Sequence, residues 1–172
     1  RRVRALTGGL LSPQSAYLLH RGLQTLPMRV LAQQENATVV ARWLQGRPEV
    51  DRVLHPSLPQ CDPTGLVGRQ MSGPGSVLSF TLRGGFVAAA AVADGCRLVT
   101  PAVSLGGVDT LIQHPAALTH RPVAPEARPS AGLLRLSVGL ESPTDVMTDL
   151  ARALAAVPGH AVTAEPELSL AT

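Results

Sequence analysis

The sequence predicts an α+β fold in which helices pack on one face of an antiparallel sheet. The first and last parts of the chain repeat apolar residues at helical spacing, whereas segments between them alternate apolar and polar residues as strands do. The expected elements follow in the order helix, strand, strand, helix, strand, strand, helix, which is typical of helices segregated to one side of a sheet. A length of 172 residues, 45% of them apolar, suits one compact unit with a core of Leu, Val and Ala.

A long helix interrupted by a proline is expected near the start. Ser12 followed by Pro13 marks its beginning, because the hydroxyl can accept a free backbone amide and proline is tolerated in the first turn. Pro27 should kink this helix, since proline disfavours helical geometry in the residue before it. A second amphipathic stretch follows over 28–45. Its apolar positions are Val30, Leu31, Ala37, Val40, Ala41 and Leu44.

Four strands and a second helix are expected in the middle of the chain. Residues 50–56 alternate as a short strand, and a proline-rich loop with a short helix leads to a strand at 76–82. The small-residue segment 86–95 predicts a helix, followed by a strand at 97–103. Residues 133–141 form the fourth predicted strand.

The last predicted helix begins at Ser142, with Pro143 in its first turn and Asp145 placed to complete a capping box. The chain then loses its periodicity and becomes rich in Pro, Ala and Glu. We therefore expect one domain over 1–156 and a tail or linker over 157–172.

Composition argues against several classes of protein. Aromatic residues make up only 2% of the chain, and the arginines are mostly scattered between acids, so we expect no nucleic-acid partner. Cys61 and Cys96 are far apart and lack neighbouring ligands at metal-binding spacing, which predicts two reduced thiols and no metal site. No apolar run has membrane-spanning length and the opening residues do not resemble a signal peptide, so we expect no membrane partner and a cytoplasmic location.

Ser104, in the stretch SLGG, is the first candidate for chemistry. It does not form a G-x-S-x-G motif, and His114 or His120 could act as its base only if the fold brings one of them close. The alternative is a tight glycine-containing loop in which the serine only hydrogen-bonds the turn.

Arg135, in the strand LLRLSVG, is the second candidate. Alternation places it on the face opposite Leu134 and Leu136. A guanidinium in the middle of a strand needs an acceptor, and its planar fork suits the carboxylate of an amino-acid substrate. The alternative is an edge-strand arginine paired with a glutamate of the same chain, and the residues alone leave both open.

Four separated blocks of the chain carry a family resemblance. They are GGLLSPQSAYLLHRGLQTLPMRV with NATVVARWL and PEVDRVLHPSLP, then RQMSGPGSVLSFTLRGG, AVSLGGVDTLIQHPAALTH and GLLRLSVGLESPTDVMTDLARAL. From about Leu6 to Leu154 the chain resembles the C-terminal part of the Cys/Met-metabolism pyridoxal-phosphate enzymes, which include cystathionine and methionine γ-lyases. The resemblance implies the small domain of a fold-type I enzyme.

The resemblance also implies a cofactor, pyridoxal 5'-phosphate, and roles for particular residues. All fifteen Lys+Arg positions are arginine, so the family's Schiff-base lysine is expected on a cofactor domain that is not in this chain. Arg135 matches the arginine that binds the substrate α-carboxylate. Ser104 matches a serine near the lysine, with a positioning role. Val103 stands where cystathionine-specific members tend to have glutamate, which favours a substrate without a distant ammonium.

The implied activity is carbon–sulfur cleavage of a sulfur amino acid by β- or γ-elimination. The substrates favoured are methionine, cysteine, cystine or an S-substituted cysteine, although SLGG departs from the SLGD of methionine γ-lyase and the loop 121–132 is shorter than usual. A homodimer or homotetramer is implied as well. Two alternatives remain: a lyase domain of a larger assembly-line polypeptide acting on an S-cysteinyl intermediate, and a non-catalytic scaffold.

Overall fold

The computed structural model describes residues 2–118, 123–124 and 127–157. The tail expected over 157–172 therefore lies outside the described residues beyond Val157, as do His120 and part of the loop 121–132. The elements are α1 (Arg2–Thr7), α2 (Pro13–Gln24), α3 (Leu26–Gln45), β1 (Val50–Leu54), the 3-10 helix η1 (Pro59–Cys61), β2 (Val77–Leu82), α4 (Gly85–Gly95), β3 (Thr100–Pro101), β4 (Leu111–Gln113), β5 (Leu133–Ser137) and α5 (Pro143–Ala155).

The strands form one sheet in the order β1-β2-β5-β4-β3. The pairs β1–β2, β2–β5 and β4–β5 are antiparallel, whereas β3 and β4 run parallel. The predicted α+β class is confirmed, but the sheet is mixed rather than wholly antiparallel. The difference arises at one edge, because the loop 102–110 returns the chain to the starting end of β3 before β4 begins.

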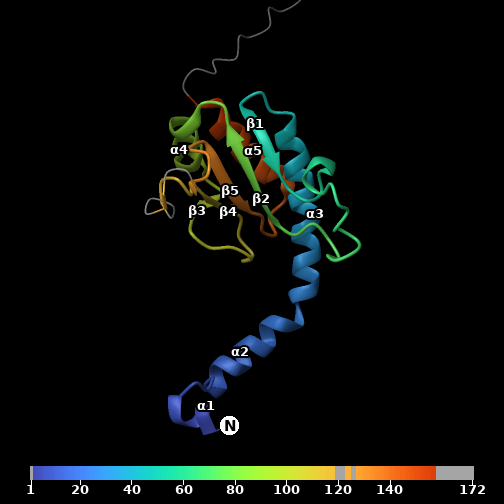
Figure 1. The fold of residues 1–172 in the computed structure, drawn as a ribbon, viewed down its shortest axis with the longest axis vertical. Helices are drawn as coiled ribbons and strands as arrows, with labels where there is room; N and C mark the ends of the chain where they lie inside the picture. Colours follow the sequence, from blue (N-terminus) through green and yellow to red (C-terminus); the bar gives the residue numbers. More distant parts are fainter. Residues whose placement is uncertain (1, 119–122, 125–126, 158–172) are drawn as a thin grey trace, which may run out of the picture.

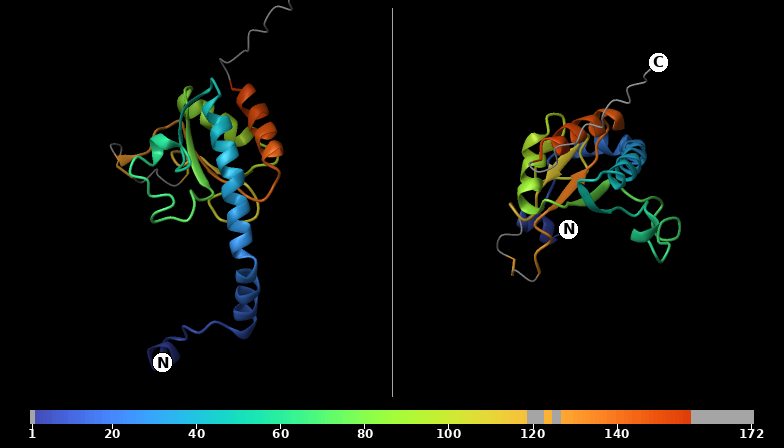
Figure 2. Two further views of the ribbon diagram at one scale, coloured as in Figure 1. Left: turned by 90° about the vertical axis from the view of Figure 1, so that its right-hand side faces the viewer. Right: turned by 90° about the horizontal axis from the view of Figure 1, so that it is seen from above.

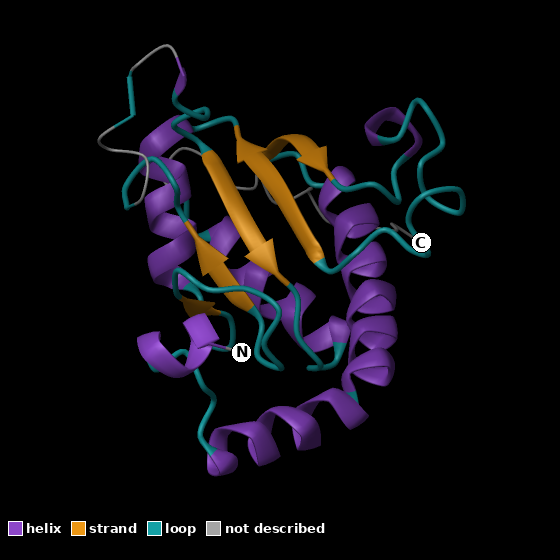
Figure 3. Ribbon diagram, turned by 60° about the horizontal axis from the view of Figure 1, so that its bottom comes forward, coloured by secondary structure: helices purple, strands orange, loops and turns teal. Residues whose placement is uncertain are grey.

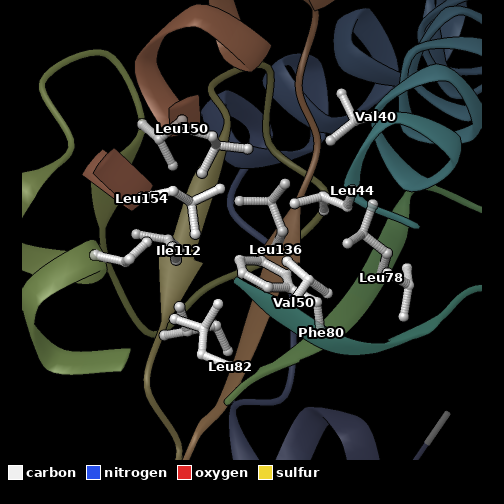
Figure 4. Close-up of a cluster of buried hydrophobic side chains, with 14 of the residues drawn as sticks. Val40, Leu44, Val50, Leu78, Phe80, Leu82, Ile112, Leu136, Leu150 and Leu154 are labelled. Carbon is white, nitrogen blue, oxygen red and sulfur yellow. The ribbon is translucent and has the colours of Figure 1, made fainter. Parts of the chain in front are cut away.

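Helices α3, α4 and α5 all lie on one side of the sheet, as predicted (Figures 1 and 2). Figure 4 shows the core that fills the space between them. The strands contribute Leu78, Phe80, Leu82, Ile112, Leu134 and Leu136 to it. The helices contribute Val40, Leu44, Ala88, Ala89, Val92, Val146, Leu150 and Leu154. The opposite face of the sheet carries no helix among the described residues, and Figure 3 shows this open face.

The long N-terminal helix is broken where the sequence predicts. Helix α2 ends at Gln24 and α3 begins at Leu26, directly before Pro27. Ser12 caps α2 by accepting the backbone N–H of Ser15 at 3.1 Å. Helices α1 and α2 extend away from the body and bury no described side chain (Figures 1 and 2). The sequence does not predict α1.

All four predicted strands are shorter than expected, two of them markedly, and one strand was missed. Only Thr100 and Pro101 pair within the predicted strand 97–103, because the Asp149 carboxylate takes the backbone N–H groups of the three preceding residues and proline has no N–H to offer a ladder. The predicted strand 133–141 ends at Ser137. Strand β4, three residues long, lies in a stretch that was predicted only as the wall of a site.

The capping box predicted at the start of α5 is wrong. Ser142 is the N-cap residue, but its side chain accepts no capping hydrogen bond. The backbone N–H of Asp145 donates instead to the Ser142 carbonyl oxygen at 3.0 Å. The aspartate side chain is exposed, so this end of the helix is left to backbone hydrogen bonding and to Pro143, whose missing N–H removes one orphan donor.

Candidate functional site

Arg135 lies on the central strand of the sheet and points to its open face. Its neighbours in register are Ser79 on β2 and Gln113 on β4, so the row across the sheet contains no carboxylate. Leu134 and Leu136 are buried on the helix side, which confirms the alternation predicted for this strand. The side chain therefore stands where a second body or a ligand can reach it.

The guanidinium of Arg135 is only partly satisfied. Its Nη2 donates to the Ser104 carbonyl oxygen at 2.7 Å, whereas its Nε is buried and has no hydrogen-bond partner. None of the ion pairs formed between described residues includes Arg135. The alternative of an edge-strand arginine paired with a glutamate does not hold for this part of the chain, because β5 is central. A planar fork with spare donors suits an anion such as a carboxylate.

The loop that carries Ser104 is tied to the same strand. Gly106 adopts a φ of 75°, a left-handed conformation that favours glycine. Its backbone N–H donates to the Ser137 hydroxyl at 3.0 Å. Since Arg135 holds the carbonyl of Ser104 two residues earlier, β5 anchors the loop 102–107 at two points through its outward-facing side chains.

A second set of contacts joins the end of this loop region, just before β4, to the segment after β5. The Glu141 carboxylate accepts both the backbone N–H and the hydroxyl of Thr110, each at 2.6 Å. The same hydroxyl accepts the backbone N–H of Gly139 at 2.9 Å. From α3, Asn36 donates to the carbonyl oxygens of Gly139 and Glu141. The segment after β5, the loop and the long helix are thus joined into one hydrogen-bonded unit.

Ser104 and Val103 are both exposed, with Val103 58% exposed. The structure does not support a Ser104 nucleophile activated by His114. The His114 ring is buried, its Nε2 lies 2.8 Å from the Ala131 carbonyl oxygen, and it packs against Phe86. No hydrogen bond joins it to Ser104 within the described residues. The main-chain carbonyl, rather than the hydroxyl, is the group of Ser104 that contacts Arg135.

Sequence reasoning missed the residues that support this site from a distance. Gln33, Asn36, Thr110 and Glu141 were not singled out, although each holds the Ser104 loop or the segment beside it. The sequence did contain a signal for Gln33 and Asn36. Both are polar residues on the helical face that otherwise buries apolar residues such as Ala37 and Val40. Buried polar side chains of this kind need partners.

Known proteins resemble nearly the whole chain. The family model described as Cys/Met metabolism PLP-dependent enzyme matches residues 1–155. The chain is 56% identical over 154 residues to an L-methionine gamma-lyase of Brevibacterium aurantiacum, covering 90% of this chain and 38% of that protein. It is 43% identical over 156 residues to an L-methionine gamma-lyase of Porphyromonas gingivalis, covering 88% of this chain and 39% of that protein.

Solved structures agree with these relatives. A cystathione gamma lyase from Micromonospora echinospora superimposes with a TM-score of 0.83 and 41% identity, covering 90% of this chain and 41% of that one. The structure described as metB from Corynebacterium glutamicum superimposes with a TM-score of 0.77 and 37% identity, covering 81% and 37% respectively. The chain thus spans about two fifths of the length of the relatives it matches.

Together these likenesses show that the chain belongs to the Cys/Met metabolism PLP-dependent enzyme family, which confirms the resemblance inferred from the four sequence blocks. Pyridoxal phosphate is the cofactor of this family. Because this chain contains no lysine, none of its side chains can form a Schiff base with the cofactor aldehyde. What the open face offers is a guanidinium with spare donors, and these donors fit the carboxylate of an amino-acid substrate.

Proposed function

We propose that this chain forms the substrate-carboxylate side of the active site of a pyridoxal-phosphate-dependent carbon–sulfur lyase acting on a sulfur amino acid. The observation that carries the proposal is Arg135, a cation in the centre of an open sheet face with a buried, unpartnered Nε and no carboxylate beside it. An unpaired buried donor is costly, and a substrate carboxylate would satisfy it. The family membership supports the lyase class.

In this proposal Arg135 binds the substrate α-carboxylate, and the Ser104 carbonyl keeps its fork facing the substrate. Fixing the carboxylate sets the direction of the bonds at the α-carbon, so the contribution of the chain is orientation. Bound pyridoxal phosphate supplies the electron sink that such eliminations require. Overall, the amino acid and one water would yield an oxo acid, ammonia and a sulfur product: a thiol from methionine or an S-substituted cysteine, sulfide from cysteine, and a persulfide from cystine. The exposed Val103 presents an apolar wall to the rest of the substrate.

The remaining parts of the site would come from partners. A lysine-bearing cofactor domain is proposed to face the open side of the sheet, and the assembly is proposed to be a homodimer or homotetramer in the cytoplasm. The absence of lysine from the chain and its coverage of about two fifths of each relative support a larger assembly. No helix in the described parts of the chain is long and apolar enough to cross a membrane.

The substrates proposed are methionine, cysteine, cystine or an S-substituted cysteine. Names of relatives favour methionine, since several are L-methionine gamma-lyases. Two further hypotheses share the same fold: a lyase domain of an assembly-line polypeptide acting on an S-cysteinyl intermediate, and a non-catalytic scaffold. The partly satisfied fork of Arg135 favours a ligand-binding role over the scaffold.

The experiment that tests the proposal supplies the intact protein with pyridoxal phosphate and then with each free sulfur amino acid. Release of a thiol, sulfide or persulfide together with an oxo acid supports the lyase. 2-Oxobutanoate from methionine indicates γ-elimination, and pyruvate from cystine indicates β-elimination. Borohydride reduction followed by peptide mass analysis locates the cofactor-bound lysine. Failure to release an oxo acid and a sulfur product from any free amino acid, with a labelled lysine present, would contradict the free-substrate proposal and favour the tethered one. Absence of any labelled lysine would favour the scaffold.

A further inference from the structure

Gln33 is a polar side chain buried in the middle of α3. It is only 2% exposed and lies one helical turn before the core residue Ala37. Its Nε2 donates to the Gly107 carbonyl oxygen at 2.5 Å, across 74 residues of sequence. A glutamine in the interior needs a partner, but an apolar residue of similar length would fill the same space without that need. The amide of Gln33 is therefore best explained by the group that it binds, the Gly107 carbonyl.

The partner belongs to the loop that carries Ser104. Side chains outside the loop hold it at three nearby backbone groups: Arg135 at the Ser104 carbonyl, Ser137 at the Gly106 N–H and Gln33 at the Gly107 carbonyl. Packing contributes little there, because a Cβ added at Gly106 or Gly107 would meet nothing within 4 Å. The apolar side chains of this loop are themselves exposed.

Since hydrogen bonds rather than packing hold the loop, each anchor matters for where the Ser104 carbonyl lies. That carbonyl is the hydrogen-bond acceptor that orients the Arg135 fork. Two of the anchors come from β5, the strand that carries Arg135 itself. Gln33 is the anchor that comes from outside the sheet, so it fixes the loop relative to the body of the domain.

We propose that Gln33 is a positioning residue for substrate binding: it holds the Ser104–Gly107 loop so that the Ser104 carbonyl sets the direction of the Arg135 guanidinium. This inference rests on the proposed function of Arg135. Gln33 itself touches neither substrate nor cofactor, and it acts through Gly107. Its effect should appear in substrate affinity rather than in the rate of bond breaking, because a bound carboxylate still holds Arg135 and is still oriented by it, whereas the free guanidinium is less often in the direction that binding needs.

The test compares Gln33→Leu with Gln34→Leu. Gln34 is its neighbour on the same helix, and its side-chain oxygen accepts the backbone N–H of Gly75 in a different loop. The first readout is hydrogen–deuterium exchange of the Gly106 amide in this chain. Loss of one anchoring hydrogen bond should speed this exchange about 3- to 10-fold in Gln33→Leu and leave it unchanged in Gln34→Leu. Equal exchange in the two variants would overturn the inference.

The second readout is steady-state kinetics of the intact holoenzyme. Gln33→Leu should raise KM about 3- to 10-fold while kcat changes by less than about 2-fold. Gln33→Glu should behave like the wild type at low pH, where the protonated carboxyl donates to the Gly107 carbonyl, and should lose affinity as that carboxyl ionises. A KM unaffected by Gln33→Leu, or a Gln33→Glu variant without pH dependence relative to the wild type, would overturn the inference.

The two readouts separate failure of this inference from failure of the proposed function. If the wild-type holoenzyme cleaves no sulfur amino acid while Gln33→Leu still loosens Gly106, the lyase proposal fails and the anchoring role of Gln33 stands. If the enzyme is active and neither readout responds to Gln33→Leu, the positioning role fails and the lyase proposal stands.

Discussion

Asp149, on α5, supports a test of how the sheet edge is held. Its carboxylate is 7% exposed and accepts the backbone N–H groups of Arg97, Leu98 and Val99 at 2.9–3.0 Å. It also accepts a hydrogen bond from Arg152 at 2.5 Å. These contacts close the turn between α4 and β3. Replacing the residue with asparagine keeps its size and puts an N–H donor where an acceptor was.

The magnitude follows from what the asparagine side chain can still accept. Its one oxygen can keep the N–H groups of Leu98 and of the buried Val99, but these hydrogen bonds lose their charge, and its NH2 group then faces the Arg152 guanidinium, donor against donor. A hydrogen bond to a charged group contributes about 1.5–3 kcal/mol, compared with about 0.5–1.5 kcal/mol for a neutral one, and the lost Arg152 pair adds a smaller amount. We therefore expect Asp149→Asn to lower the free energy of unfolding by about 2–4 kcal/mol at pH 7.

The effect should depend on pH. Burial acts to raise the pKa of Asp149, but the hydrogen bonds from the Val99 N–H, the Arg152 side chain and the other two backbone amides outweigh it and hold the pKa below its ordinary value. A carboxyl whose folded pKa is depressed contributes stability above its unfolded pKa, about 3.9, and loses that contribution as the pH falls through the folded value. The gap between wild type and Asp149→Asn should therefore narrow in acid.

The assay is urea unfolding at pH 7 and again at a series of pH values from about pH 4 downwards, below the unfolded pKa. Asp145→Asn is the matched control, since Asp145 is exposed on the same helix and should cost less than about 1 kcal/mol. A loss for Asp149→Asn no larger than that of the control, or one that does not shrink with acid, would refute the reasoning.

Two further predictions concern particular atoms. Gly139→Ala should lower the free energy of unfolding by about 2–3 kcal/mol in urea titrations, because its Cβ would collide with the Val108 carbonyl oxygen. Gly107→Ala is the control and should cost less than about 0.5 kcal/mol, because its Cβ would meet no atom within 4 Å. Equal costs for the two variants would contradict the close contact between Gly139 and Val108. Burial, followed by the nearby Asp149 carboxylate, raises the pKa of the Cys96 thiol to about 12, so iodoacetamide at pH 8 should modify it at least about 100-fold more slowly in the folded chain than in urea. Comparable rates in the two states would show that the thiol is not protected.

Local sequence signals predicted the larger elements well. The Ser12–Pro13 pair and Pro27 placed the start of α2 and its junction with α3, and alternation in LLRLSVG placed Arg135 on the face away from the core. These features depend on residues close together in sequence. The α+β class followed because three helical segments and the strands each have one apolar face to bury.

The parts that sequence reasoning missed depend on contacts between distant segments. The predicted strand 97–103 is too long because the Asp149 carboxylate, which accepts hydrogen bonds from its backbone N–H groups, lies some 50 residues later in the sequence, on α5. The contact from Gln33 to Gly107 spans 74 residues, and the one from Glu141 to Thr110 spans 31. Residue type alone indicates that such side chains need partners, but only the fold shows which partners they have.

The central claim is that Arg135 binds the carboxylate of an amino-acid substrate. The most direct measurement compares kcat/KM for L-methionine with that for its carboxamide, in the intact wild-type holoenzyme, in Arg135→Gln and in Arg52→Gln. Arg52 is the matched control, because it lies on the same open face at the edge strand, opposite Thr81. We predict that Arg135→Gln lowers kcat/KM for methionine about 30- to 1000-fold and removes the preference for the carboxylate, while Arg52→Gln keeps both. An unchanged carboxylate preference in Arg135→Gln would contradict the account.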